Sequence, residues 1–336
     1  MPLTRTSGLR VAIVGAASLK GKELREVLED RLFPIKRFSL LDDDEAQGQL
    51  TEFEGEPAVI QSIDPETFSA NDLVFFASTA GGFTRTHRPA AAAGSAALID
   101  LSHALLDTPE AEVRVPFLSG APHLSGGARR FIVPHAAAIV LWAVAERLAA
   151  AFSLRQIVAN IFEPVSERGA AGLKELQEQT VRLLSFQDFP RTVFDAQVAF
   201  NLLTQYGAGS RSRLEETEDI IRREMARAAP ELQEMLALRV IQVPVFHSHT
   251  LSILVELEER CEVADLEEVL QGERVRLLGR DAAPAAAVEA AGQEEILIGP
   301  VLRDAGRRSA FWLWAAADNL RLPSRTAVDI AEELLE

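Results

Sequence analysis

Sulfur is scarce in this chain of 336 residues, which contains one cysteine and three methionines. A single thiol, Cys261, excludes a disulfide within the chain and suits a reducing compartment, so we expect a cytoplasmic protein. Long apolar runs are also missing. The longest, from Ala136 to Ala145, has ten residues before Glu146 interrupts it, which is too short to cross a bilayer. Since no cleavable leader is recognisable, we expect neither export nor membrane insertion.

Positive charge is in short supply as well. The chain has 34 lysines and arginines against 50 acidic residues, a net charge of −16. Long-range repulsion therefore disfavours a nucleic-acid backbone or an anionic lipid surface as a partner. The apolar fraction is 48%, enough for more than one core, and a chain of this length predicts two domains, since domains usually have about 100–200 residues.

The first third of the chain alternates between short β-branched runs and helical patterns. Strands are expected over residues 9–14, 37–41, 72–77 and 96–101, and helices over 20–29 and 84–93. Such alternation is typical of parallel strands joined by right-handed helical crossovers. The expected fold class is therefore α/β, with a Rossmann-type doubly wound nucleotide domain.

From about residue 131 the pattern changes to longer strands. Strands are expected over 156–165, 239–247, 250–258, 295–301 and 311–317, and helices over 136–151, 173–184 and 215–228. These elements predict an α+β domain on a mixed or antiparallel sheet. The alanine-rich segment 282–291 is interpreted as an exposed insertion. A final amphipathic helix, 324–334, is expected to return to the first domain, which gives domains of 1–130 with 322–336, and 131–321.

A glycine-rich turn follows the first predicted strand and opens the first predicted helix. In that position backbone N–H groups and the helix dipole can hold a pyrophosphate. A serine stands near the place of the fingerprint's third glycine, so a tight turn without a ligand stays open as an alternative. The candidate cofactor-binding residues in this turn are Gly15, Ala17, Ser18, Leu19 and Gly21.

An acidic cluster, Asp42 to Glu45, follows the second predicted strand. A carboxylate there, such as that of Asp42 or Asp43, can accept both ribose hydroxyls of a dinucleotide and repels a 2′-phosphate. No arginine stands in the cluster to pair with a phosphate. If a nicotinamide nucleotide binds, we expect NAD over NADP, and the alternative is a solvated acidic turn with no cofactor.

Six short strings occur in a recognisable order along the chain. They are Val11-Ala12-Ile13-Val14-Gly15-Ala16, Ala80-Gly81-Gly82, Leu98-Ile99-Asp100-Leu101-Ser102, Pro164-Val165-Ser166, Val243-Pro244-Val245 with His249, and Asp318-Asn319-Leu320-Arg321. Together they resemble the aspartate-semialdehyde dehydrogenase family from Gly8 to the C-terminus, and the departures resemble its Usg-type paralogues. The resemblance implies a dinucleotide domain, an inserted catalytic domain that dimerises, and a terminal helix that returns to the first domain.

The resemblance also implies that the nucleophile is missing. The family forms a thioester on a cysteine in an Asn-Pro-Asn-Cys-Ser-Thr turn, and the corresponding segment here begins Val133-Pro134-His135-Ala136. Ala136 therefore occupies the place of the nucleophile, and a methyl group cannot form an acyl intermediate. Cys261 lies twelve residues beyond His249, up to about 40 Å away in an extended chain, and is interpreted as a small buried hydrophobe.

The other positions of the family's site divide into those that this sequence matches and those where it has lost a cation. The resemblance implies that His249 is the acid/base histidine and Glu215 the glutamate that holds the substrate amine. The resemblance also implies that the cations that bind a carboxylate or phosphate in the family are replaced here by Gln242, Leu106 and Thr217. Glu163 stands in place of a glutamine. Glu167 and Arg168 stand in place of small residues. On the cofactor side the resemblance implies contacts from Ser78, Ala80, Gly81 and Asn319, with Thr326 in place of an asparagine.

Three functions stay open. The first is a homologue that dimerises without catalysing reductive dephosphorylation of aspartyl phosphate and binds a nucleotide or another protein. The second is an NAD(P)-dependent oxidoreductase of altered substrate with His249 as base. The third is hydrolysis by a zinc ion bound to His135, Glu163 and His249. The alternative to this zinc site is that His247 and His249 point to one face of a strand and have ordinary packing or hydrogen-bond roles. A homodimer is the expected assembly, since two-fold symmetry is commonest among soluble oligomers.

Overall fold

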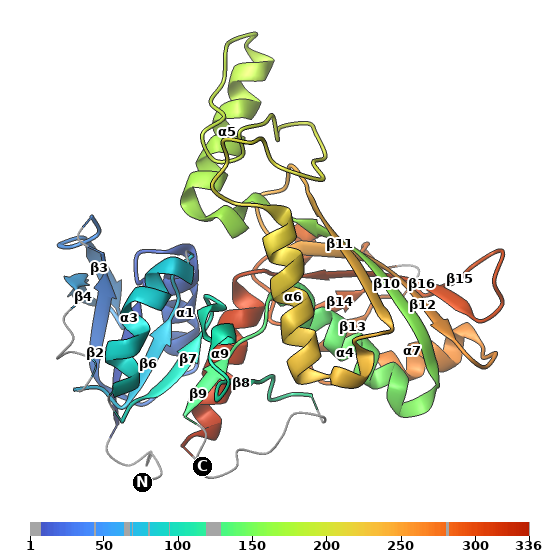
Figure 1. Cartoon of the computed structure of the whole chain (residues 1–336), viewed down its shortest axis with the longest axis horizontal. Coiled ribbons are helices and arrows are strands. Elements are labelled where there is room, and N and C mark those ends of the chain that lie inside the picture. The colour runs from blue at the N-terminus through green and yellow to red at the C-terminus, as the bar shows by residue number, and fades with distance from the viewer. Residues whose placement is uncertain are drawn as a thin grey trace. The chain divides into compact units, whose positions relative to one another are not determined.

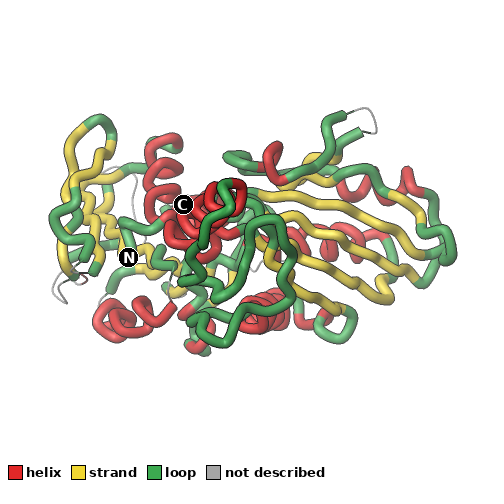
Figure 2. The backbone as a smooth tube through the Cα atoms, turned by 90° about the horizontal axis from the view of Figure 1, so that it is seen from above, coloured by secondary structure: helices red, strands yellow, loops and turns green. Residues whose placement is uncertain are grey.

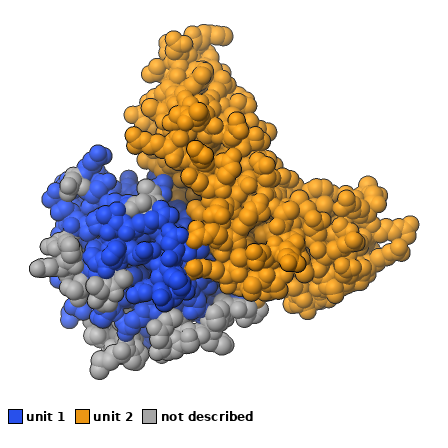
Figure 3. All heavy atoms as spheres, in the orientation of Figure 1, with its two compact units in different colours: residues 1–134, 323–336 blue, residues 135–322 orange. Residues whose placement is uncertain are grey.

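The computed structural model describes residues 8–43, 45–63, 68, 70–79, 81–93, 95–118, 129–279 and 282–335. The chain divides into two compact units, shown in different colours in Figure 3. The first unit comprises residues 1–134 and 323–336, and the second comprises residues 135–322. Within the described residues, no helix has the length and apolar character needed to cross a membrane.

The first unit is built on a parallel sheet with the strand order β5-β2-β1-β6-β7-β9-β8. Strands β6 and β7 are buried at every position, which explains why they appear in the sequence as continuous apolar runs rather than alternating ones. A two-stranded hairpin, β3 with β4, lies outside this sheet. The elements are β1 (Leu9–Val14), α1 (Leu19–Asp30), β2 (Ile35–Asp42), β3 (Leu50–Phe53), β4 (Glu56–Val59), β5 (Gln61–Ser62), β6 (Leu73–Phe76), α3 (Gly81–Ala93), β7 (Ala97–Asp100), η2 (Ala104–Asp107), β8 (Glu112–Val113) and β9 (Arg130–Ile132). Figure 1 labels most of the helices and longer strands of both units.

The last helix, α9 (Arg321–Glu333), contributes to the core of the first unit. Val328, Ile330 and Ala331 are fully buried in the same apolar cluster as Val11 and Ile13 of β1. Their 3.6-residue spacing predicted an apolar stripe in need of a surface, and the first sheet provides it. Helix α9 therefore completes the apolar core of the first unit.

The second unit is built on a mixed sheet with the order β11-β10-β12-β16-β14-β13, and β15 pairs with β16. Its long strands run side by side in Figure 2. Strands β10 and β11 are parallel, whereas β12 is antiparallel to both β10 and β16. The elements are α4 (Ala136–Ala151), β10 (Leu154–Glu163), η3 (Val165–Arg168), α5 (Gly169–Leu184), α6 (Leu214–Ala228), η4 (Pro230–Leu232), β11 (Leu236–Gln242), β12 (His249–Leu257), α7 (Val263–Leu270), β13 (Val275–Leu277), α8 (Ala287–Ala290), β14 (Ile296–Ile298), β15 (Leu302–Arg303) and β16 (Ala310–Ala317). These two units are the predicted α/β fold class, which is confirmed.

One face of the second sheet is covered by helix α4. Along β12, from His249 to Leu257, side chains alternate between buried and half-buried, as the two-residue period of a strand requires. Helix α4 packs on β10, β12 and β16. Its first ten residues, 136–145, are all buried, which explains why this helix is apolar on every side. The candidate site of this unit lies on the helix-covered face.

Two predicted strands end earlier than expected. The strand expected over 239–247 is wrong beyond Gln242, where β11 ends. Pro244 has no N–H for a sheet, and Ser248 adopts a left-handed backbone with φ 74°. His247 therefore lies outside any strand, and the interpretation of His247 and His249 as strand neighbours is wrong. The strand expected over 156–165 ends at Glu163, after which Val165 opens the 3₁₀ turn η3.

The interpretation of residues 282–291 as an exposed insertion holds for most of its positions but is wrong for Ala285 and Ala290. Ala285 and Ala290 are 1% and 0% exposed and pack with Leu297 and Ala316 of the sheet. The Ala285 carbonyl also accepts a hydrogen bond of 2.6 Å from the indole of Trp314. Small side chains at these two positions allow the segment to approach the sheet closely, so Ala285 and Ala290 form part of the core.

Candidate nucleotide and active sites

The glycine-rich turn of the first unit depends on glycine at two positions. Gly15 has φ +88°, and a Cβ there would overlap the backbone of Ser78 at the end of β6. A Cβ at Gly21 would overlap the carbonyl oxygen of Gly15. The turn therefore packs backbone against backbone at the carboxyl end of the sheet, where open α/β sheets bind their ligands.

Two polar side chains hold this turn. Ser18 caps α1, accepting a hydrogen bond of 2.9 Å from the Gly21 N–H, and its hydroxyl donates to the Ala77 carbonyl at 2.6 Å. The Asp42 carboxylate accepts from the N–H of Ala17 at 2.7 Å and of Asp43 at 2.9 Å. Asp42 thus fixes the turn, while the unused lone pairs of its two oxygens remain available to a ligand.

A cavity of about 400 Å³ opens beside the turn. The predicted residues Gly15, Ala17, Ser18, Asp42, Asp43 and Ser78 line it, together with Glu45, Ala46, Gln49, Thr79 and Phe83. None of these lining residues is a lysine or arginine. Of the other predicted contacts, Leu19 and Gly21 lie in the first turn of α1 and Gly81 begins α3, whereas Ala80 lies outside the described residues. Sequence reasoning missed Gln49 and Phe83, because no motif marks them.

In the second unit, three buried polar side chains meet at one edge of the sheet. Glu163 and Gln242 end the parallel strands β10 and β11 in register, and His249 begins the antiparallel strand β12 beside them. Each is 0% exposed. Since these ends coincide and alternate positions face helix α4, the fold directs the three side chains into one region.

Glu163 forms a buried ion pair with Arg168 of η3. The Arg168 Nη2 lies 2.5 Å from Glu163 Oε1 and 3.2 Å from the Thr217 hydroxyl, and the Arg168 Nε donates to the Tyr206 oxygen at 3.1 Å. Burial raises the pKa of Glu163, and the charge of Arg168 opposes that shift. Burial also disfavours the charge on Arg168, but Glu163 and Tyr206 outweigh it, so the pKa of Arg168 is raised. The two opposite charges therefore stabilise each other in this buried position.

Gln242 completes this arrangement, which we call the Arg168 network: Glu163, Arg168, Tyr206, Thr217 and Gln242. Its amide Nε2 donates to the Glu163 carbonyl at 2.7 Å and the Val243 carbonyl at 3.0 Å. Its Oε1 accepts from the Tyr206 hydroxyl at 2.7 Å, a shorter contact than the 3.3 Å to Glu163 Oε1. The single Tyr206 proton therefore goes to Gln242, and both amide donors of Gln242 are engaged.

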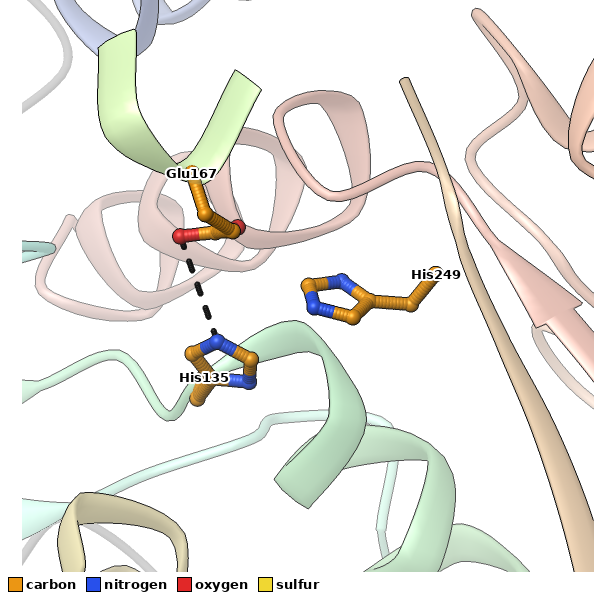
Figure 4. A group of neighbouring side chains, drawn as sticks. All are labelled: His135, Glu167 and His249. Atoms are coloured by element: carbon orange, nitrogen blue, oxygen red, sulfur yellow. Dashed lines mark ion pairs between the residues drawn. The ribbon is translucent and has the colours of Figure 1, made fainter. Parts of the chain in front are cut away.

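A second group, which we call the histidine cluster, contains His135, Glu167 and His249 (Figure 4). The ring of His135 lies edge-on to that of His249, with 4.8 Å between centroids, and its Nε2 lies 3.9 Å from Glu167 Oε2. The carboxylate beside the two histidines is therefore that of Glu167, and the expected grouping with Glu163 is wrong. Because β10 ends at Glu163 and η3 turns the chain, the carboxylate four residues later is the one that reaches the rings.

His135 also begins helix α4. Its Nδ1 accepts a hydrogen bond of 3.2 Å from the Ala137 N–H, and its own N–H donates to Glu224 Oε2 at 2.8 Å. Ala136, at the predicted nucleophile position, is the first residue of α4 and is 2% exposed. The helix N-terminus thus presents an imidazole and a methyl group at this place.

Asn319 supports the histidine cluster from the turn after β16. Its Nδ2 donates to Glu167 Oε1 at 2.9 Å, and its Oδ1 accepts from the Ser248 N–H at 2.9 Å. It also shares a hydrogen bond with the Ser166 hydroxyl. This amide, predicted to meet a cofactor, joins three segments that are distant in the sequence.

The remaining predicted residues lie apart from these groups or are buried. Glu215 is exposed in the first turn of α6, and Leu106 is buried in η2. Thr326 is buried in α9. Cys261 lies between β12 and α7 and is only half-buried, so its interpretation as a buried hydrophobe is wrong. Burial still raises the pKa of its thiol, with Asp265 adding to the effect, which disfavours the nucleophilic thiolate.

Comparison with known families accounts for both units. Residues 10–147 match the NAD binding domain of semialdehyde dehydrogenases, and residues 146–322 match the dimerisation domain of semialdehyde dehydrogenases. This chain belongs to the semialdehyde dehydrogenase family. The first unit therefore has the architecture of a nicotinamide-nucleotide domain.

Relatives of this family member cover nearly its whole length. A USG-1 protein homolog of Pseudomonas aeruginosa is 32% identical over 330 residues, 97% of each chain. An aspartate-semialdehyde dehydrogenase of Rickettsia bellii is 27% identical over 342 residues, 98% of this chain and 99% of the other. Among solved structures, a probable aspartate-semialdehyde dehydrogenase from Pseudomonas aeruginosa is 31% identical with a TM-score of 0.88, covering 100% of this chain and 99% of that one. Aspartate semialdehyde dehydrogenase II from Vibrio cholerae, complexed with ASA, is 25% identical with a TM-score of 0.89, covering 98% and 99%.

Proposed function

We propose that this family member does not catalyse reductive dephosphorylation of aspartyl phosphate. The observation that carries the proposal is the methyl group of Ala136 at the first position of α4. That reaction needs a thiolate to capture the acyl group before hydride transfer. The chain's one thiol belongs to Cys261, beyond the far end of β12, and its pKa is raised by burial. No sulfur is supplied at the place where the family's thioester forms.

The Arg168 network supports the same proposal from the substrate side. Gln242, in place of a substrate-binding arginine, has both amide donors engaged by backbone carbonyls. The only guanidinium in the network, that of Arg168, is bonded to Glu163. A carboxylate substrate would have to compete with a buried carboxylate at 2.5 Å from that guanidinium. These contacts leave neither Gln242 nor Arg168 available to bind a substrate anion, which supports the proposal.

A turnover assay tests this proposal. The purified full chain is incubated with aspartate semialdehyde, phosphate and either NAD or NADP, and reduced nucleotide is followed by absorbance. We expect no phosphate-dependent signal above a blank lacking protein, because no acyl intermediate can form. Phosphate-dependent turnover that persists through purification to homogeneity would refute the proposal.

We further propose that the first unit binds NAD in preference to NADP. The cavity beside Gly15 is lined by Asp42, Asp43 and Glu45, with no cation among its lining residues. Carboxylates there can accept the ribose hydroxyls and repel a 2′-phosphate. In isothermal titration we expect NAD to bind at least ten-fold more tightly than NADP, a difference of about 1.4 kcal/mol.

Two matched variants test whether the carboxylates of the cavity cause the preference for NAD over NADP. Asp43→Ser removes one exposed carboxylate of the cavity and should narrow the preference for NAD. Glu52→Ser makes the same charge change on the β3–β4 hairpin, outside the cavity lining, and should leave the preference unchanged. Equal affinity of the unmodified chain for both nucleotides contradicts the electrostatic argument.

We propose a homodimer as the assembly. The match of residues 146–322 to a dimerisation domain supports it. So does the aromatic surface of β16, where Trp312 and Trp314 are 38% and 39% exposed.

A second candidate function is an NAD(P)-dependent oxidoreductase of altered substrate with His249 as base. Its support is that His249 is buried at the sheet edge, facing the ring of His135 in the histidine cluster. Hydride transfer from an alcohol needs a base but no thiol. An absence of heat with both NAD and NADP in the nucleotide titration eliminates the oxidoreductase, whereas binding of NAD is compatible with both candidates.

A further inference from the structure

The histidine cluster combines the ligands that transition metals use in proteins. His135, Glu167 and His249 each offer one ligand atom, and these atoms lie within 4.8 Å of one another. The side chains come from the start of α4, from η3 and from the start of β12, and they point toward one another in Figure 4. Two imidazoles and one carboxylate form a set that holds zinc with one position left open.

We propose that His135, Glu167 and His249 bind one divalent transition-metal ion, of which Zn²⁺ is the representative. In a tetrahedral site with bonds of about 2.0–2.1 Å, neighbouring ligand atoms lie roughly 3.3 Å apart. The His135 Nε2 and Glu167 Oε2 are 3.9 Å apart. The three ligand atoms lie within 4.8 Å of one another, so they have to approach by up to about 1.5 Å to share a common ion.

The surroundings of the cluster fit a cation. The Asn319 amide, by donating to Glu167 Oε1 at 2.9 Å, orients the carboxylate with Oε2 toward His135. A hydrogen bond to the far oxygen of a ligating carboxylate is the usual way in which proteins orient such ligands. Glu167 places the negative charge of a carboxylate beside the two rings. That charge favours a divalent ion over a neutral ligand.

Coordination changes the hydrogen bonding of helix α4. Since the Nδ1 of His135 accepts from the Ala137 N–H, the proton of the neutral ring lies on Nε2. A metal bound at Nε2 takes the place of this proton, and the neutral ring then carries its proton on Nδ1. The Ala137 N–H loses its acceptor as a result. Metal binding at this site should therefore change the environment of the Ala137 amide, which can be measured.

Metal content is the direct test, and it does not depend on catalysis or on the proposed function. The full chain is dialysed against Zn²⁺ and its bound zinc is measured by mass spectrometry. We expect one zinc per chain for the unmodified protein. His135→Asn keeps a side chain suited to cap α4, and His249→Gln replaces the imidazole at the start of β12 by a polar amide. Each variant should weaken zinc binding at least ten-fold. His247→Gln, in the loop outside the cluster, should bind zinc like the unmodified chain.

Two measurements on the unmodified chain keep the test decisive if a variant fails to fold. Co²⁺ should give the visible absorption of a four- or five-coordinate nitrogen and oxygen site, and Zn²⁺ should shift the NMR signal of the Ala137 amide. The proposal is overturned if zinc remains well below one per chain, or if folded His135→Asn and His249→Gln bind it like the unmodified chain. It is equally overturned if Co²⁺ keeps the spectrum of its aqueous ion or the Ala137 amide does not move.

Discussion

Replacing Arg168 by methionine should destabilise the second unit by about 3–5 kcal/mol, the usual loss when one partner of a buried ion pair is removed. The carboxylate of Glu163 is 0% exposed and would keep no cation to offset its charge. For a unit of this size the loss corresponds to a fall in Tm of roughly 6–20 °C. Thermal and urea unfolding of Arg168→Met measure it.

Two further variants separate the pair from a general packing defect. Adding Glu163→Gln to Arg168→Met removes the buried charge, so the double variant should recover at least half of the lost stability. Arg239→Met breaks a pair with Glu218 at 2.9 Å whose arginine is 60% exposed, and should lower stability by about 1 kcal/mol or less. A double variant no more stable than Arg168→Met alone would contradict the account of the ion pair.

Under the proposed function, introducing a thiol at position 136 should not produce phosphate-dependent turnover. Ala136→Cys places sulfur at the N-terminus of α4, where the helix dipole favours a thiolate. Neither Gln242 nor Arg168 becomes available to bind a substrate anion, however, because both remain engaged within the Arg168 network. Since a misplaced substrate can lose about 100-fold for each lost anchor, we expect turnover on the order of 10⁴-fold below a family member with its cations. The assay is phosphate-dependent formation of reduced nucleotide.

The control for this variant uses a chain without other sulfur nucleophiles. In a Cys261→Ser background, Ala136→Cys should take up one alkyl group by mass spectrometry, whereas Ala136→Ser should take up none. Labelling without turnover assigns the defect to substrate anchoring. Efficient turnover by Ala136→Cys alone would mean that the missing thiol is the whole of the defect.

Much of the fold could be predicted from the sequence because its patterns are local. The apolar run after Pro134 predicted α4 with the bounds that the structure shows, and the two-residue alternation marked β12 to within one residue. The end of β11 could not be placed in this way, since Val243, Val245 and Phe246 continue an apolar pattern past Gln242. What ends the strand is the missing N–H of Pro244 and the left-handed backbone at Ser248.

The candidate sites were harder to predict because tertiary contacts decide which side chains meet there. The turn at Gly15 is a local motif and was located from its residues. Glu163 and Glu167 are both acidic and only four residues apart, and sequence alone could not tell which reaches His135 and which reaches Arg168. The choice depends on the point at which β10 gives way to η3. Tyr206 of the Arg168 network lies in an irregular loop that no motif marks.

The Glu163–Arg168 pair also constrains how such a chain could change over evolutionary time. Losing Arg168 first would leave the buried carboxylate of Glu163 without its cation. The resulting protein would be less stable and would be degraded more readily in the cell. Neutralising the glutamate first is the gentler route, because the 15% exposed guanidinium keeps its contacts with Tyr206 and Thr217. The two orders of substitution therefore differ in their cost to stability, and losing Glu163 first is the less destabilising one.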